Sequence, residues 1–422
     1  MKNIRNNILK TGLIVITGIF VGFLLLSLAY LVPTGKIRTH IKESIPLLES
    51  EGENPYLIEN YKGSSLDNYT DEIMLCIAGF QSERPFYKAA MIAERKNMDE
   101  EEPLQWLKSD LLNEGEGYTA RYSRYWHGYL IFLKPLLYFL NYSQIRKLNS
   151  LFFGLVLFLL AIAFARRKMW FGIYAEALAI LTLFPGSIPY SFQFSSCFYV
   201  AAFAEIGLLW DYEKLEEKGW LGLYFCGIGI FTSFFDLLTY PVITVGFSLI
   251  IFTVLCPKEW SGCIRNIILY GISWACGYVG MWAGKWIIGT VVTGENLFAD
   301  AVKSVKVRTS GSTDYTELGI SDVIGRNADV LNNAYGKMIV MAGLIVVVIV
   351  FAVTAVLRKT IDYKKVFLLI MLSLIPIVWY CGTANHSYIH YWYTFRDLSV
   401  TVFAVTMIPE MLVQSMRAEK SR

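Results

Sequence analysis

Charged residues are scarce in this chain. Asp, Glu, Lys and Arg make up 17% of the 422 residues, whereas 55% are hydrophobic and the mean hydropathy is +0.44. This composition excludes an ordinary soluble domain, in which about a quarter of residues are charged. The charges fall between apolar runs of about 17–25 residues, the length at which a helix crosses a bilayer. We therefore predict an all-α, polytopic membrane protein.

Common catalytic signatures are also missing. The sequence has no Walker loop, no glycine-rich dinucleotide turn, no Gly-x-Ser-x-Gly motif and no cysteine pairs at metal-site spacing. The seven cysteines are scattered, so no disulfide framework is expected, and the net charge of +3 indicates no nucleic-acid partner. Nucleotide-dependent chemistry on the cytosolic side is disfavoured. We expect no cofactor; a divalent metal ion is possible, but nothing in the sequence indicates one.

Ten apolar runs are long enough to be counted as transmembrane helices. They are 12–32, 150–165, 169–185, 197–210, 220–238, 241–256, 267–291, 338–357, 366–383 and 398–413. The first run follows a basic N-terminus, as the apolar part of a signal peptide would, but it is long and no small-x-small cleavage site follows it. We interpret it as an uncleaved signal-anchor.

Charge bias orients these spans. Residues 33–127 hold 11 Lys and Arg against 17 Asp and Glu, whereas the connections 166–168 and 358–365 are basic. Because basic loops stay in the cytosol, we expect cytoplasmic N- and C-termini and two extracytoplasmic loops, 33–127 and 292–337. The whole chain, 1–422, is predicted to be a single multi-pass domain of the cell membrane, with the lipid bilayer as its surroundings.

The first outer loop ends in the aromatic and basic run Arg121-Tyr-Ser-Arg-Tyr-Trp-His127. Residues 128–140, which follow, are apolar but too short to span a bilayer, and they contain Lys134-Pro135. We predict that 128–140 form an amphipathic helix in the outer interface, with Lys134 snorkelling toward the lipid head groups.

Acidic residues lie near the middle of the same loop. The apolar spacing after residue 72 predicts a helix that begins near Thr70, with Thr70 as N-cap, Asp71 and Glu72 in the first turn, and Asp67 just before it. These carboxylates either complement the helix dipole or belong to an active site at the membrane surface.

Two ionisable residues fall within predicted spans, where an unpaired charge is costly. Asp236 lies near the outer end of span 220–238 and should be paired, for instance with a neighbouring Tyr or Lys, or face a wet cavity. Lys285 lies about two turns inside the outer end of span 267–291. It either snorkels to the head groups or offers a cation to a lipid phosphate.

The densest polar cluster connects the last two spans. His386 and His390 are four residues apart, on one face if the segment is helical, and Tyr393 and Arg396 follow them. Two histidines at this spacing can bind zinc, but no His-Glu-x-x-His motif or cysteine partner accompanies them. His and Arg donors also suit an anionic group. An aromatic belt with interfacial cations is the simpler alternative.

This layout resembles the GT-C glycosyltransferases, which include bacterial glucosyltransferases that decorate O-antigen. The shared features are a cytosolic N-terminus, one span, a large outer loop with an early acidic residue and interface helices, and many further spans. The phrases Tyr-Trp-His-Gly-Tyr (125–129) and Phe-Asp-Leu-Leu-Thr-Tyr-Pro (235–241) are also similar to those of membrane proteins from bacterial surface-polysaccharide loci.

The resemblance implies an inverting sugar transfer from a polyprenyl-phosphate donor to a glycan or lipid acceptor of the cell envelope, on the outer face. Asp71 would be the general base for the acceptor hydroxyl, with Asp67 and Glu72 competing for that role. The residues expected to bind substrate are Asp67, Glu72, Arg124, His127, Asp236, Lys285, His386, His390, Tyr393 and Arg396.

Two other functions stay open. A transporter or flippase for a lipid-linked glycan usually has paired half-sequences or broken helices, and the sequence shows no inverted repeat. A polysaccharide polymerase or ligase would concentrate basic residues in a late outer loop. Residues 295–337 form such a loop, with Lys303, Lys306, Arg308 and Arg326.

Overall fold

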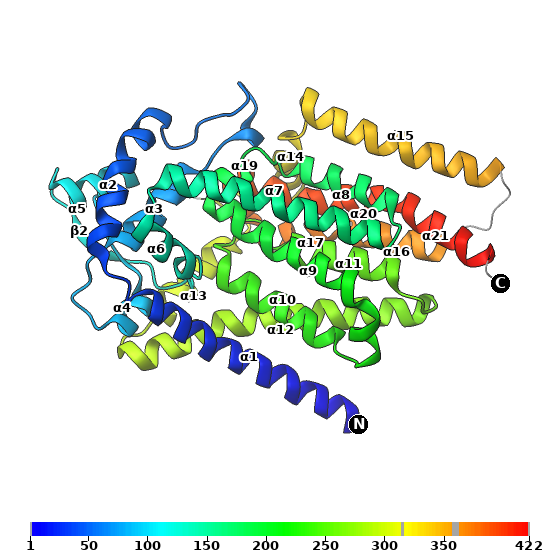
Figure 1. Ribbon diagram of the computed structural model, residues 1–422, viewed down its shortest axis with the longest axis horizontal. Helices are drawn as coiled ribbons and strands as arrows, with labels where there is room; N and C mark the ends of the chain where they lie inside the picture. The colour runs from blue at the N-terminus through cyan, green and yellow to red at the C-terminus, as the bar shows by residue number, and fades with distance from the viewer. Residues whose placement is uncertain (1, 314–315, 357–362, 421–422) are drawn as a thin grey trace.

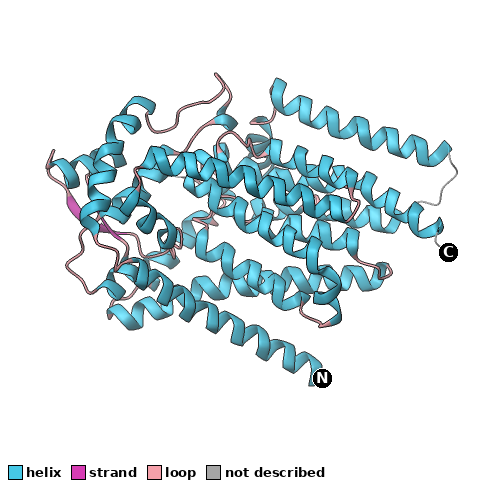
Figure 2. Cartoon of the chain, in the orientation of Figure 1, coloured by secondary structure: helices cyan, strands magenta, loops and turns pink. Residues whose placement is uncertain are grey.

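The computed structural model of the protein describes residues 2–313, 316–356 and 363–420, and its regular structure is almost entirely helical (Figure 2). Long helices lie side by side in a bundle, and a compact set of short helices covers one end of it (Figure 1). We call this the loop end; it consists of residues 33–141, 294–313 and 316–333. Both chain termini lie at the opposite end of the bundle (Figure 1).

The bundle is formed by helices from both halves of the chain. They are α1 (Lys2–Ala29), α7 (Tyr142–Arg166), α8 (Trp170–Thr182), α9 (Phe192–Glu217), α10 (Leu221–Phe235), α11 (Val242–Leu255), α12 (Trp260–Thr293), α15 (Ala334–Val356), α16 (Tyr363–Leu372), α17 (Ile375–Gly382), α20 (Ser399–Thr406) and α21 (Ile408–Lys420). A 3₁₀ turn, η2 (Ile188–Tyr190), precedes α9, and η3 (Phe395–Leu398) precedes α20.

Seven helical segments among the described residues are long and apolar enough to cross a membrane, which identifies a polytopic helical membrane protein. They coincide with seven of the ten predicted spans. The remaining three predicted spans, 169–185, 220–238 and 241–256, match the shorter apolar helices α8, α10 and α11. The count of ten therefore stays a prediction. Residues 357–362, most of the predicted connection 358–365, lie outside the described part of the chain.

The loop end contains short helices and one small sheet. Its elements are α2 (Thr34–Glu51), η1 (Lys62–Ser64), α3 (Asn68–Gly79), α4 (Phe86–Ile92), β1 (Glu94–Asn97), α5 (Pro103–Leu112), β2 (Tyr118–Arg121), α6 (Leu130–Phe139), α13 (Phe298–Arg308) and α14 (Ile320–Asp329). The antiparallel pair β1–β2, with Glu94 opposite Arg121, departs from the all-α prediction. The helices α18 (Ala384–Ile389) and α19 (Tyr391–Thr394) bring the late polar cluster to this end.

Two sequence predictions about the loop end are wrong in detail. The N-cap of α3 is Asp67, whose carboxylate accepts from the amide of Thr70 at 3.1 Å; Thr70 lies inside the helix. Lys134 does not snorkel. It is 1% exposed, and its ammonium donates to the carbonyl of Ala78 at 2.8 Å, because the last turn of α3 presents a carbonyl without a helical partner.

Two large hydrophobic cores and one small cluster hold the described part of the chain together. One fills the bundle between α8, α9, α11 and α20, with Phe198 and Phe403 among its members. The other joins α1 and α10 to α3 and α6, so that the loop end is packed onto the bundle rather than tethered to it. Gly128 shows how close this approach is, because its amide donates to the carbonyl of Phe234 at 2.9 Å and a Cβ there would lie 2.4 Å from that oxygen.

Candidate functional site

The site is built around three acids at the start of α3, namely the N-cap Asp67 and the helix residues Asp71 and Glu72, and each has different surroundings. Asp71 is fully buried, and its carboxylate already accepts hydrogen bonds. The hydroxyl of Tyr142 donates to it at 2.6 Å, and the amide of Phe192 donates at 2.9 Å. The first amides of α9 have no helical acceptor, so Asp71 acts as their partner. Burial raises the pKa of Asp71 to about 8, although these donors oppose the shift.

Asp67 is also committed to structural contacts. Its carboxylate caps α3 and accepts from the side-chain amide of Gln193, and its own amide nitrogen lies 2.9 Å from the Ser191 hydroxyl. Burial raises the pKa of Asp67 to about 6, opposed by the bonds from Thr70 and by the charge of Arg396. Asp67 and Asp71 together fix the start of α9 against α3.

Glu72 differs from both neighbours. It is 0% exposed, yet neither of its carboxylate oxygens has a hydrogen-bond partner. Burial raises the pKa of Glu72 to about 8, and the nearby carboxylates of Glu53 and Asp71 add to the shift. Because a buried polar group is normally hydrogen-bonded, an unpartnered acid with a raised pKa is the functional candidate among the three.

Three arginines gather around Tyr122, just after β2. The guanidinium of Arg95 lies 5.4 Å from the centre of the Tyr122 ring, and that of Arg124 lies 4.6 Å from it. The charge of Arg308, from α13, acts on Tyr122 and Tyr125. We call Arg95, Tyr122, Arg124, Tyr125 and Arg308 the arginine–tyrosine cluster.

Few acids neutralise this cluster. The only ion pair of its members among the described residues is Arg124–Asp300, at 3.3 Å. The Nε atoms of Arg95 and Arg124 are buried and have no hydrogen-bond partner. Guanidinium donors left open in this way suit a phosphate or carboxylate group.

The late histidines join the cluster through Arg308. His386 donates from Nε2 to the carbonyl of Leu238 at 2.7 Å, so its Nδ1 is the acceptor that faces the guanidinium of Arg308. The rings of His386 and His390 lie 4.8 Å apart, as the four-residue spacing predicts. Burial lowers the pKa of both, to about 4 for His390. They are therefore neutral at pH 7, and the arginines carry the positive charge.

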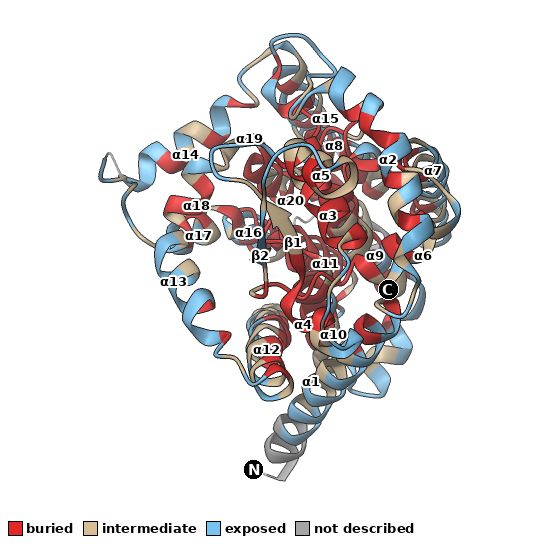
Figure 3. Ribbon diagram, turned by 90° about the vertical axis from the view of Figure 1, so that its left-hand side faces the viewer, coloured by how far each residue is buried: buried red, intermediate tan, exposed pale blue. Residues whose placement is uncertain are grey.

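Tyr393 links the early and late segments. It interacts electrostatically with Arg308, with Asp67 of the first loop, and with Tyr125 and Tyr122. Seen from the loop end (Figure 3), α13, α14 and α18 lie on one side of the β1–β2 pair and α2 and α3 on the other. Segments separated by more than three hundred residues in sequence thus lie together at the loop end.

Other predicted site residues hold the backbone in place. Arg396 is fully buried and donates to the carbonyls of Leu183 and Gly63 at 3.0 and 3.2 Å. Lys285 neither snorkels nor stands free: its ammonium donates to the carbonyl of Met91 at 3.0 Å, at the end of α4. Asp236 accepts from the amides of Leu238 and Thr239 at 2.9 and 3.0 Å, in place of the predicted Tyr or Lys partner.

His127 connects the cluster to the membrane bundle. It adopts a positive φ of 56°. Its Nε2 lies 2.6 Å from the carbonyl of Tyr122, and its Nδ1 lies 3.1 Å from the hydroxyl of Tyr129. Burial lowers the pKa of His127 to about 3, so this link is uncharged at neutral pH.

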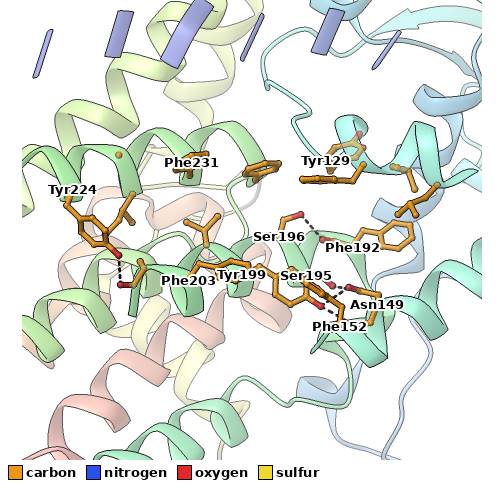
Figure 4. Close-up of a pocket in the computed structure, with 18 of the residues that line it drawn as sticks. Tyr129, Asn149, Phe152, Phe192, Ser195, Ser196, Tyr199, Phe203, Tyr224 and Phe231 are labelled. Carbon is orange, nitrogen blue, oxygen red and sulfur yellow. Dashed lines mark hydrogen bonds between the residues drawn. The ribbon is translucent and has the colours of Figure 1, made fainter. Parts of the chain in front are cut away.

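An apolar groove of about 1110 Å³ begins at Tyr129 and runs between α7, α9 and α10. Figure 4 shows Tyr129 and Phe192 at one end and Tyr224 at the other, with Tyr199, Phe203 and Phe231 between them. From Phe192 to Leu215 the lining of α9 covers roughly 35 Å at 1.5 Å per residue. The groove is therefore as long as one bilayer is thick.

At its end nearest the loop end, this groove meets both polar groups. The amide of Phe192 is the donor to Asp71, and the hydroxyl of Tyr129 lies against His127. A long apolar chain lying in the groove would bring its polar head to the acids of α3 and the arginine–tyrosine cluster.

Sequence reasoning missed several of these residues. Arg95 was one charged residue among many in a polar loop, and only the β1–β2 pairing places it beside Tyr122. Arg308 was noted only as part of a basic loop. Glu176 and Glu205 lie inside apolar helices, where an acid is costly, and that signal was available in the sequence.

No group of three or more His, Cys, Asp and Glu within the described ranges is placed to hold a metal ion. Comparisons of the chain with models of protein families, with curated proteins and with solved structures find no match. The functional conclusion therefore depends on the residues and their geometry.

Proposed function

We propose that this protein is a membrane glycosyltransferase that moves a sugar from a polyprenyl-phosphate donor to a glycan or lipid acceptor of the cell envelope. The observation that supports it best is the meeting of the apolar groove with the polar site at Phe192 and Tyr129. The polyprenyl chain occupies the groove, and its phosphate and sugar reach the loop end. With the loop end outside, the reaction takes place on the outer face of the cell membrane.

Glu72 is the general base in this proposal, in place of the predicted Asp71. Both oxygens of Glu72 are free to accept a proton, whereas those of Asp71 already accept from Tyr142 and Phe192. Glu72 removes the proton of the acceptor hydroxyl while the oxygen of that hydroxyl attacks the anomeric carbon of the donor sugar. The bond from that carbon to the phosphate oxygen breaks, and the lipid phosphate leaves with its electron pair.

The arginine–tyrosine cluster stabilises the leaving phosphate. Arg95, Arg124 and Arg308 offer donors, and Asp300 is their single ion-pair partner in the part of the chain that the structure describes. Donors fixed in place before the reaction stabilise charge as it develops in the transition state. Asp67 and Asp71 position the start of α9, so they act on the shape of the site rather than on the reacting atoms.

The test is Glu72→Gln, assayed in membranes with a panel of labelled polyprenyl-phosphate hexoses. We expect transfer to fall at least 100-fold, the loss typical of a missing general base, with expression and insertion unchanged. Glu114→Gln, an exposed acid of the same loop end, is the matched control and should retain full activity. Full activity of Glu72→Gln would remove Glu72 from the mechanism. Absence of transfer from every donor by the wild-type chain would contradict the proposal itself.

Two alternatives each have one supporting observation. Two buried acids in contact inside the bundle, Glu176 and Glu205, suit an ion-coupled transporter or flippase of a lipid-linked glycan. Arg308 of the second loop contacts His386, and this contact supports a polysaccharide polymerase or ligase, which would need that loop in its site. Movement of labelled donor lipid across a vesicle membrane without sugar transfer would favour the transporter.

A further inference from the structure

Glu176 and Glu205 are acids in the interior of the helical bundle. Glu176 lies near the middle of α8 and is 4% exposed; Glu205 lies near the middle of α9 and is 1% exposed. At 1.5 Å per residue, Glu205 is roughly 20 Å along α9 from its start at Phe192. Phe192–Glu217 is one of the helices long and apolar enough to cross the membrane, and Glu205 lies in its apolar part, six residues before Asp211.

The two carboxyl groups are neighbours, and each acts on the electrostatics of the other. Neither oxygen of Glu176 has a donor, and one oxygen of Glu205 is likewise buried and unpartnered. A carboxylate can only accept a hydrogen bond. Two carboxyl groups that face each other therefore form a hydrogen bond only when one of them carries a proton.

No cation compensates this pair. None of the ion pairs among residues 2–313, 316–356 and 363–420 includes Glu176 or Glu205. The hydroxyl of Tyr224, which interacts electrostatically with Glu205, donates instead to the carbonyl of Ala204 at 2.7 Å. Two ionised carboxylates this close together in the interior of the bundle would repel each other and lose their hydration without compensation.

A bound metal ion does not fit the surroundings. Hard cations such as Ca²⁺ take six to eight oxygen ligands, and no third His, Cys, Asp or Glu in the described part of the chain completes such a set. A proton needs only the two oxygens that face each other.

We infer that Glu176 and Glu205 form an intramembrane proton-binding site in which the carboxyl groups share a proton as O–H···O. The shared proton links α8 to α9 through these two side chains. Its loss would place two like charges beside each other in the interior of the bundle. The site also borders the groove, because Ala204 and Tyr224 both line it. This inference goes beyond sugar transfer and does not depend on it.

Infrared spectroscopy of the full chain in lipid bilayers tests the inference. We expect the wild type at neutral pH to show a carbonyl band of a protonated carboxylic acid that shifts in D₂O and is reduced in the double variant Glu176→Gln/Glu205→Gln. Other buried acids, such as Asp71 and Glu72, contribute equally to both samples, so the difference spectrum isolates the pair. Each single variant should keep part of the band, because the remaining acid has no charged partner.

Identical spectra of the wild type and the double variant would overturn the inference, since both acids would then be ionised. A sodium-dependent rise in thermal midpoint without an acid band would assign the site to a metal cation instead. The double variant should fold, because two amides can hydrogen-bond each other. If it does not, dicyclohexylcarbodiimide labelling of the wild type decides: the reagent adds to protonated carboxyls, and labelling confined to exposed acids would overturn the inference.

Discussion

At the scale of single residues, Glu72 and Asp71 are neighbours in sequence but have different surroundings. Asp71 is held by Tyr142 and by the first amide of α9, 71 and 121 positions away along the chain. Glu72, one residue on, faces no donor. A helical pattern places both acids in one turn but does not say what each side chain meets, so the sequence alone could not choose between them.

The pH dependence of sugar transfer should follow the ionisation of the Glu72 carboxyl group. A general base acts in its ionised form, and burial raises the pKa of Glu72 to about 8. We therefore expect kcat/KM for the donor to rise with pH and to level off above about 8. A profile that is already flat near pH 6 would assign the base to another group. Glu72→Gln should lose this rise along with most of the activity.

The free energy of unfolding should also depend on pH through Glu72, and the direction of this dependence follows from its raised pKa. Because the folded pKa of Glu72 is raised, the stabilisation from its protonated form is full at low pH and is lost as the pH rises through about 8. Glu72→Gln cannot ionise. We expect Glu72→Gln and the wild type to have the same thermal midpoint near pH 5. Above about pH 8 the variant should have the higher midpoint and a free energy of unfolding larger by up to a few kcal/mol. Parallel curves across this range would contradict the raised pKa.

Substitution of Arg396 can distinguish a structural role of this residue from the predicted role in phosphate binding. Its guanidinium satisfies buried carbonyls of Leu183 and Gly63. We expect Arg396→Met to destabilise the protein by about 2–3 kcal/mol, the cost of leaving such groups unpaired. The measurement is thermal unfolding in detergent, with Arg121→Met, whose side chain is 54% exposed, as a control that should change stability little. Loss of transfer at unchanged stability would instead support the predicted role in phosphate binding.

At the scale of elements, the apolar groove is the feature that connects bundle and site. Gly227 on α10 lines it, and a Cβ at that position would meet nothing within 4 Å. Gly154 on α7 is equally open but is not part of the groove lining. These two glycines therefore allow a matched comparison.

We expect Gly227→Leu to obstruct the groove and raise the KM for a long-chain polyprenyl-phosphate donor about 10-fold or more, the price of roughly 1.4 kcal/mol in binding. The KM for a short-chain, water-soluble donor should not change, and Gly154→Leu should affect neither. Steady-state kinetics with both donors make the comparison. An equal effect of Gly227→Leu on both donors would exclude the groove as the lipid site.

At the scale of the whole molecule, the position of the termini limits the topology. Both lie at the end of the bundle opposite the loop end (Figure 1), which an even number of crossings requires. Side-specific labelling can therefore test the predicted orientation. The protein needs a single reporter cysteine, so Cys276 and Cys381, whose side chains are not covered by the chain, are replaced.

With those two cysteines replaced, Glu116→Cys at the exposed loop end should react with a membrane-impermeant maleimide in intact cells. A tag at either terminus should become accessible to antibody only after permeabilisation. Labelling of Glu116→Cys only in permeabilised cells would reverse the orientation. Termini on opposite sides would rule out ten spans.

The sequence by itself determined that the chain is a helical membrane protein, because long apolar runs have no other stable place than a bilayer. It also indicated the helix at 128–140, seen as Leu130–Phe139, since an apolar run too short to span still needs an apolar surface. Local composition suffices for such features because each is decided within one element.

Only the tertiary structure decided which polar groups are committed and which are free. Asp71, Lys134, Lys285 and Arg396 each satisfy backbone groups of distant segments, while Glu72 and the arginines around Tyr122 keep unused hydrogen-bonding capacity. A charged residue within an apolar run is easily found in a sequence, because such residues are rare and costly in lipid. Its role depends on its partner, and partners are set by contacts between elements that no local pattern encodes.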